Sequence, residues 1–146
     1  MSSLSARHAL AGIALLMLGA CASEKVVRSP APPDTDWSQA RTLTVKMTDF
    51  EFSPSHISLP VRVPIRLTLV NEGTDDHDFS APTFFSAVMY RPGSVVSDKG
   101  NIELAQGQRI EVDILPVAVG TYKLDCTEFL HSMLGMTGKI EVTDTP

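Results

Sequence analysis

The sequence has 146 residues, which is the usual length of a single domain. Hydrophobic residues make up 43% of it, enough for a core, and ten prolines with nine glycines predict many turns. The formal net charge of −5 argues against a nucleic-acid partner, which would favour a basic patch.

Residues 1–20 have the pattern of a signal peptide. Arg7 and His8 precede an apolar run over 9–20, which is too short to cross a bilayer and is typical of a signal-peptide core. The run ends in Leu18-Gly-Ala-Cys21, which resembles the cleavage box of bacterial lipoproteins. This resemblance implies a lipid on Cys21 and a periplasm-facing anchor. Ala22 after the cysteine favours the outer membrane over the inner one. The alternative is an ordinary signal peptide with an incidental cysteine.

Residues 21–40 are predicted to be the lipidated cysteine and a flexible tether, followed by a domain over 41–146. Prolines, serines and charges dominate 22–40, and a polyproline-like chain of this length would reach roughly 60 Å. Packing of Val26, Val27 and Trp37 on the domain is the alternative. With lipid on Cys21, Cys126 is the only thiol of the exported chain, so it is either a buried apolar residue or a ligand.

Apolar residues alternate with polar ones along the rest of the chain, which predicts seven or eight short strands. The apolar positions are Leu43, Val45 and Met47, Phe50 and Phe52, Ile57 and Leu59, Ile65, Leu67 and Leu69, the stretch 84–90, Ile110, Val112 and Ile114, Tyr122 and Leu124, and Ile140 and Val142. Gly, Pro and Asn separate these segments, and no βαβ alternation is present. The pattern predicts an all-β Greek-key sandwich or barrel of antiparallel strands.

The C-terminal region contains the motif C-x4-H-x4-M, formed by Cys126, His131 and Met136. Because side chains alternate along a strand, Cys126 is expected on the core-facing side, where its strand ends. His77 follows the turn at 71–73 and is the fourth candidate. One thiolate, two imidazoles and a thioether are the ligands of a blue-copper electron-transfer centre. The sequence therefore predicts one mononuclear copper site.

On these residues, the segment 42–142 resembles the cupredoxins, with a ligand spacing similar to that of rusticyanin and auracyanin. The resemblance implies that His77, Cys126 and His131 are equatorial ligands and that Met136 is the axial ligand. Met133 is the competing candidate for the axial position. His56 lies outside the constellation and is interpreted as a surface or turn histidine, with an accessory metal role as the alternative.

Two departures from the family pattern stand beside the ligands. Phe129-Leu130 occupies the place where Pro-Gly often precedes the loop histidine, and Asp78 replaces the Asn or Ser that often follows the first histidine. Asp78 and Thr127 each follow a ligand directly. We expect them to contact each other and to tune the metal through its ligands, with an exposed Asp78 as the alternative.

The expected function is that of a monomeric protein, not an enzyme, that carries single electrons between redox partners. Acidic Asp75, Asp76 and Glu128 would steer a basic partner such as a cytochrome, or an oxidase, toward an apolar patch. The candidates for this patch are Met133, Leu134, Phe84 and Phe85, and a core position is the favoured alternative for the two phenylalanines. The main alternative is a lipid-anchored chaperone or buffer that delivers copper with the same ligands. The absence of a methionine-rich run favours the carrier. A catalytic copper enzyme would need more histidines, and a metal-free envelope domain is the remaining alternative.

Overall fold

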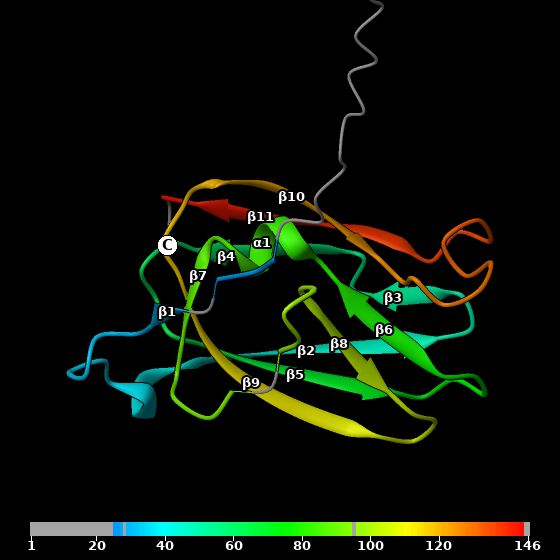
Figure 1. Cartoon of the computed structure of the whole chain (residues 1–146), viewed down its shortest axis with the longest axis horizontal. Coiled ribbons are helices and arrows are strands. Elements are labelled where there is room, and N and C mark those ends of the chain that lie inside the picture. The colour runs from blue at the N-terminus through cyan, green and yellow to red at the C-terminus, as the bar shows by residue number, and fades with distance from the viewer. Residues whose placement is uncertain (1–24, 28, 95, 145–146) are drawn as a thin grey trace, which may run out of the picture.

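The computed structural model describes residues 25–27, 29–94 and 96–144, so the expected signal peptide and Cys21 lie outside the described residues. In these ranges the chain forms two sheets that pack face to face, and the longest helix is α1 (Pro82–Phe85) (Figure 1). The predicted all-β sandwich is therefore confirmed. A membrane-crossing helix, with the length and apolar character that this requires, is not found among the described residues.

The six-stranded sheet has the order β1-β7-β9-β5-β2-β3, and the five-stranded sheet has the order β4-β11-β10-β6-β8. The first contains β1 (Ser29–Pro30), β2 (Arg41–Thr48), β3 (Glu51–Ser53), β5 (Ile65–Asn71), β7 (Val88–Tyr90) and β9 (Arg109–Pro116). The second contains β4 (His56–Pro60), β6 (His77–Ser80), β8 (Asn101–Leu104), β10 (Gly120–Asp125) and β11 (Thr137–Thr143).

The core lies between the sheets and follows the alternation seen in the sequence. On β10, Tyr122 and Leu124 are buried, whereas Thr121 and Lys123 are exposed. Fully burying a leucine side chain contributes about 1.5–3 kcal/mol, so this alternation fixes which face of β10 points inward. Cys126 continues the buried series directly after the strand ends.

Two strand pairings bring distant segments to one end of the sandwich. β2 and β5 run parallel with Met47 opposite Asn71, so the turns that follow the two strands lie side by side. β10 and β11 are antiparallel with Asp125 opposite Thr137, and the loop 126–136 joins them. In Figure 1 this loop lies at the right-hand end, where β5 ends and β6 begins.

The details of the sheets differ from the expectation of seven or eight antiparallel strands. The described residues form eleven strands, and β2–β5, β4–β11 and β1–β7 are parallel pairs. The apolar stretch 84–90 is divided between α1 and β7, because Pro82 stands at the start of α1, where its fixed φ favours a helical turn. Phe84 and Phe85 are core residues.

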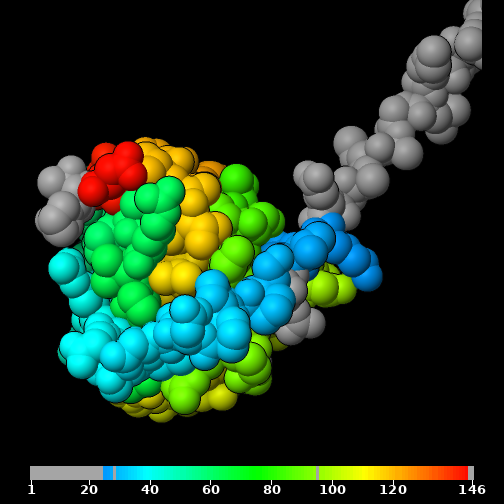
Figure 2. All heavy atoms as spheres, turned by 90° about the vertical axis from the view of Figure 1, so that its left-hand side faces the viewer, coloured from blue at the N-terminus to red at the C-terminus, as the bar shows by residue number. Residues whose placement is uncertain are grey.

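Several residues in the described part of the predicted tether contact the domain, which favours the alternative of packing over a fully free tether. The Val26 amide donates to the Asp98 carbonyl (2.9 Å), and the side chain of Val26 is buried. Ser29 and Pro30 form β1 beside β7, and Ala31 is buried. Figure 2 faces the left-hand end of Figure 1 and shows this segment lying across the molecule, whereas the 126–136 loop lies at the right-hand end of Figure 1. The contacts satisfy backbone groups and bury isolated apolar residues, which outweighs the freedom of a Pro-rich chain.

One aspartate and two arginines form an ion cluster on the six-stranded sheet. Asp113 on β9 accepts hydrogen bonds from Arg66 (2.9 and 3.1 Å) and Arg91 (2.8 Å). Burial raises the pKa of the Asp113 carboxyl, but the two guanidinium groups lower the pKa by more, so it lies below the ordinary 3.8.

Candidate metal centre

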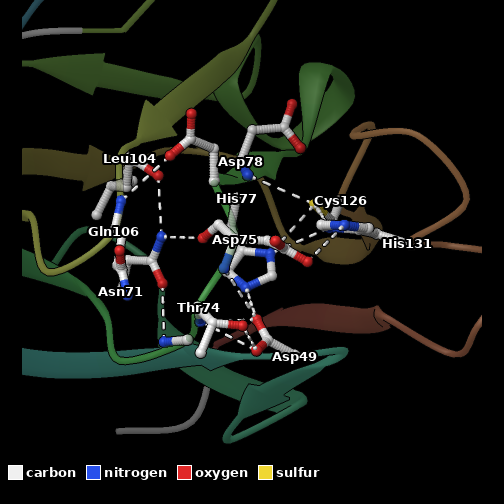
Figure 3. Close-up of polar contacts among 12 residues, drawn as sticks. Asp49, Asn71, Thr74, Asp75, His77, Asp78, Leu104, Gln106, Cys126 and His131 are labelled. Carbon is white, nitrogen blue, oxygen red and sulfur yellow. Dashed lines mark hydrogen bonds and ion pairs between the residues drawn. The ribbon is translucent and has the colours of Figure 1, made fainter.

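Three donor atoms from separate parts of the chain converge at the end of the sandwich. His77 is the first residue of β6, Cys126 follows β10 directly, and His131 lies in the loop between β10 and β11. His77 Nδ1 lies 3.1 Å from His131 Nδ1, and the Cys126 Sγ lies 3.9 and 3.5 Å from these two nitrogens, respectively. Figure 3 shows the imidazoles and the thiol pointing toward one another.

The three donor side chains are shielded from solvent by the surrounding protein. His77 and Cys126 are fully buried, and His131 is 7% exposed. The Phe50 ring packs edge-on against the His131 ring, with 4.9 Å between the centroids. Only the rim of His131 therefore reaches the surface, while its Nδ1 faces inward.

The donor set fits a copper ion. Burial raises the pKa of the Cys126 thiol to about 11, so with no cation beside it the thiol stays protonated. A coordinated metal deprotonates such a thiol, and thiolate with imidazole suits copper in both oxidation states. Two Nδ1 atoms and one Sγ all lie within 4.8 Å of one another, which one cation could bind simultaneously.

Backbone hydrogen bonds shape the loop that carries two of the candidates. The Cys126 amide donates to the Met136 carbonyl (3.1 Å), and the Met136 amide donates to the His131 carbonyl (3.0 Å). These bonds fix Met136 beside both residues, and its side chain is fully buried. The Met133 side chain is 82% exposed, which favours Met136 as the axial candidate.

Leu130 shows how the chain accommodates its departure from the family pattern. Its φ is 65°, in the left-handed region that favours glycine. The resemblance noted above often has glycine at this position, and leucine adopts a positive φ only with strain. The cost for a non-glycine residue is about 1–2 kcal/mol.

The expected contact between Asp78 and Thr127 is present. The Asp78 carboxylate accepts from the Thr127 amide (2.5 Å) and from the Thr127 hydroxyl (2.6 Å), and Asn101 Nδ2 donates to it at 3.3 Å. The Asp78 amide also donates to Cys126 Sγ (3.5 Å). Asp78 is 1% exposed, so the alternative of an exposed residue is wrong. These bonds join β6 to the start of the 126–136 loop and place the Asp78 amide against the Cys126 sulfur.

Sequence reasoning did not find Asp49, which contacts the outer nitrogen of His77. Asp49 follows β2, and its Oδ1 lies 3.0 Å from His77 Nε2. The Thr74 amide and hydroxyl donate to this carboxylate, and they hold the pKa of Asp49 well below its ordinary value. A Cβ at Gly73 would lie 2.7 Å from His77 Nε2 and even closer to Asp49, so any other residue there would displace one of these two side chains.

The surface around His131 is apolar with acidic residues nearby. Phe129, Leu130, Met133 and Leu134 are between 44% and 85% exposed. The Asp75 carboxylate lies 3.9 Å from His131 Nε2, and Asp76 and Glu128 lie in the neighbouring segments. His56 is not part of this region, because it pairs with Glu141 (2.9 Å) between β4 and β11.

Two imidazoles and a thiol that converge in a buried site at one end of an all-β sandwich define the class: a small β protein with a candidate metal centre. The sequence model of a family described as the cupredoxin-like domain matches residues 9–142. The chain therefore belongs to the cupredoxin-like domain family. Among curated proteins, no sequence matches this chain.

Solved structures share the fold at low sequence identity. A dithionite-reduced auracyanin from the photosynthetic bacterium Roseiflexus castenholzii is 18% identical, with a TM-score of 0.54 over 71% of this chain and 98% of that one. Auracyanin B is 22% identical, with a TM-score of 0.53 over 83% and 95% of the two chains. A multicopper oxidase from Campylobacter jejuni is 14% identical, with a TM-score of 0.54, and 71% of this chain matches 30% of that one.

Proposed function

We propose that this protein binds one copper ion in a type 1 centre and carries single electrons, and that it is not an enzyme. The proposed ligands are His77, Cys126 and His131, with Met136 in the axial position. The observation that carries this proposal is the convergence of His77 Nδ1, Cys126 Sγ and His131 Nδ1 in a buried site, 3.1–3.9 Å apart. When bound, copper would supply a one-electron couple between Cu(I) and Cu(II).

The chain contributes orientation, burial and a surface exit. The proposed ligands come from a strand start, a strand end and a hydrogen-bonded loop, so the sandwich itself brings them together. The buried donors would retain the ion, which supports a carrier over a chaperone that hands copper on. His131 reaches the surface with its Nε2 edge and would be the exit for the electron.

The proposed partner is a basic redox protein, such as a cytochrome or an oxidase. The exposed Phe129 and Met133 would form the apolar contact, and Asp75 and Asp76 would steer a positively charged surface toward it. We propose that the protein works as a monomer on the periplasmic side of the envelope, held by a lipid on Cys21, with the outer membrane favoured. Labelling with a radioactive fatty acid, lost in Cys21→Ser, tests the anchor.

The copper site is tested by the visible spectrum of the full chain loaded with one equivalent of Cu(II). The expected result is an intense thiolate-to-copper charge-transfer band that disappears in Cys126→Ser and persists in Cys21→Ser, the matched thiol control. Met136→Leu should change the band and the midpoint potential, whereas Met133→Leu should change neither. A colourless protein, or a band unaffected by Cys126→Ser, would contradict the assignment.

Electron transfer and copper delivery are distinguished by following the ion itself. A carrier keeps its copper when it is mixed with a Cu(I) chelator for the duration of many reduction and oxidation cycles. Rapid loss of the ion to the chelator, with slow electron exchange, would instead support a chaperone.

A further inference from the structure

Asp49 is the feature that the copper-site assignment leaves unexplained. Its carboxylate stands behind His77, on the side away from Cys126 and His131, as Figure 3 shows. Oδ1 lies 3.0 Å from His77 Nε2. The Thr74 amide donates to both oxygens at 3.0–3.1 Å, the Thr74 hydroxyl donates to Oδ2 at 2.6 Å, and the Asp75 amide lies 3.4 Å from Oδ1.

This arrangement fixes the direction of the contact with His77. A carboxylate surrounded by N–H and O–H donors is an acceptor, so the hydrogen between Asp49 and His77 is carried by Nε2. A neutral imidazole with its proton on Nε2 has its lone pair on Nδ1. Nδ1 is the atom that faces Cys126 Sγ and His131 Nδ1. Asp49 therefore selects the one tautomer of His77 that can bind a metal between these groups.

The turn around Asp49 is built for this contact. The Asn71 side chain donates to the carbonyls of Asp75 (2.9 Å) and Leu104 (3.0 Å) and accepts from the Gly73 amide (2.9 Å). These bonds close the turn 71–75 and join it to β8, and the Glu72 amide donates to the Met47 carbonyl of β2 (2.8 Å), which holds the turn beside the end of that strand. The lack of a side chain at Gly73 leaves the space in which Asp49 reaches the imidazole.

We propose that Asp49 is a positioning residue that sets both the tautomer of His77 and the charge balance of the site. This inference rests on the copper function proposed above. A carboxylate hydrogen-bonded to a metal-ligating imidazole raises the basicity of the ligand. A more basic, more negative ligand environment stabilises Cu(II) more than Cu(I), because the interaction grows with the charge of the ion. Asp49 therefore increases the affinity for Cu(II) and lowers the midpoint potential.

Other carboxylates nearby are placed differently. Asp75 lies 3.9 Å from His131 Nε2 and its side chain is 58% exposed, so solvent screens it. The Asp76 carboxylate accepts from the Gln106 amide (3.2 Å) and is exposed. Asp76→Asn thus removes one negative charge from the same segment without touching the hydrogen bond of His77, and it is the matched control for Asp49→Asn.

The first measurement uses the full chain without metal. Nitrogen-15 NMR of the histidine rings at about pH 8, where an ordinary imidazole is neutral, reports which nitrogen of His77 carries the proton. The expected result is a proton on Nε2 in the wild type, in Asp76→Asn and in Asp49→Asn, because an amide oxygen still accepts. In Asp49→Ala this preference is expected to be lost. A proton on Nδ1 in the wild type would overturn the proposal.

The second measurement is the midpoint potential and Cu(II) affinity of the loaded protein. Loss of a partner of a metal-ligating histidine costs about ten- to a hundredfold in metal affinity, which is the expectation for Asp49→Ala. Each tenfold decrease in Cu(II) affinity relative to Cu(I) affinity raises the midpoint potential by about 59 mV. Asp49→Asn should give a smaller rise, and Asp76→Asn a smaller one still.

The two proposals fail in different ways. If the wild type develops no thiolate-to-copper band, the copper function fails, and the NMR measurement still decides the role of Asp49. If the band is present but the potential of Asp49→Ala and Asp49→Asn equals that of Asp76→Asn, the positioning role is refuted and the copper function stands. Asp49→Asn keeps this test valid if Asp49→Ala does not fold, since it preserves the shape of the side chain.

Discussion

Replacing Asp78 should destabilise the metal-free protein more than any exposed charge does. Its carboxylate receives two short hydrogen bonds from Thr127, at 2.5 and 2.6 Å, and a longer one from Asn101. Hydrogen bonds to charged groups contribute about 1.5–3 kcal/mol each. Burial of the carboxylate offsets part of this sum. If each of the two short bonds contributes about 1.5 kcal/mol, the lower end of this range, Asp78→Ala should lower the free energy of unfolding by about 3 kcal/mol.

Matched variants divide this effect between the two donors. Thr127→Val removes the hydroxyl and leaves the backbone amide in place, so we expect a loss of about 1.5 kcal/mol. Asp78→Asn keeps one acceptor, and the Thr127 hydroxyl can turn to accept from the new amide, so its cost should be about 1 kcal/mol. Asp78→Ala alone already removes the partner of the Thr127 hydroxyl, so the double variant Asp78→Ala with Thr127→Val should lose about 1.5 kcal/mol less than the sum of the two single variants.

Urea unfolding of the metal-free variants measures these values, with a change in midpoint at an unchanged slope. The reasoning is refuted if the losses of Asp78→Ala and Thr127→Val add within about 0.5 kcal/mol, which is the behaviour of independent sites. It is also refuted if Asp78→Ala unfolds at the wild-type urea concentration, because the buried carboxylate then contributes nothing.

Three further variants probe separate features of the fold. Gly73→Ala places a methyl group against Asp49 and His77, so both unfolding stability and Cu(II) affinity should fall; unchanged affinity by competitive titration would show that the turn yields freely. Leu130→Gly should be more stable than Leu130→Ala by about 1 kcal/mol in urea, since only glycine relieves the positive φ, and the opposite order would contradict the strain. Asp113→Asn should cost about 1 kcal/mol at neutral pH. The native pKa of Asp113 is lowered, so its contribution is complete above the ordinary 3.8 and disappears as the pH falls through the native value. The urea midpoints of wild type and variant should therefore converge in acid, and a gap that persists there would exclude this ion cluster as the cause.

The candidate ligands could be predicted because their signals are local in the sequence. Alternation on β10 places Tyr122, Leu124 and Cys126 on one inward face, and His131 and Met136 follow within a single loop. The general fold was predictable for the same reason, since short alternating segments between turns allow few architectures.

The missed features depend on which strands pair. Asp49 lies 28 residues before His77 and reaches it only because β2 and β5 are parallel, so that their ends lie side by side. Nothing in the local sequence distinguishes Asp49 from any other acid after a strand. The parallel pairs and the short edge strand β8 were missed for the same reason. Alternation shows which face of a strand is buried, but it does not show which other strand pairs with it.

The N-terminal segment changes the geometry expected for an anchored carrier. Cys21 precedes Val26 by five residues, and a fully extended chain spans at most about 3.6 Å per residue. With Val26 docked, a lipid on Cys21 would hold the domain within about 18 Å of its attachment point, and not the roughly 60 Å of an undocked tether. A redox partner would then have to approach a domain held close to the membrane. Contact would depend more on how far the partner extends than on the length of the N-terminal segment.

Hydrogen exchange tests whether the segment stays docked. The amides of Val26 and Ala31 donate to the carbonyls of Asp98 (2.9 Å) and Tyr90 (2.8 Å), so both should be protected in the full chain. Val26→Asp, which places a charge in a buried position, should abolish the protection of residue 26 and leave the sheet amides unchanged. Exchange of both wild-type amides at the rate of an unstructured peptide would restore the long tether, and with it a carrier that sweeps a wide space above the membrane.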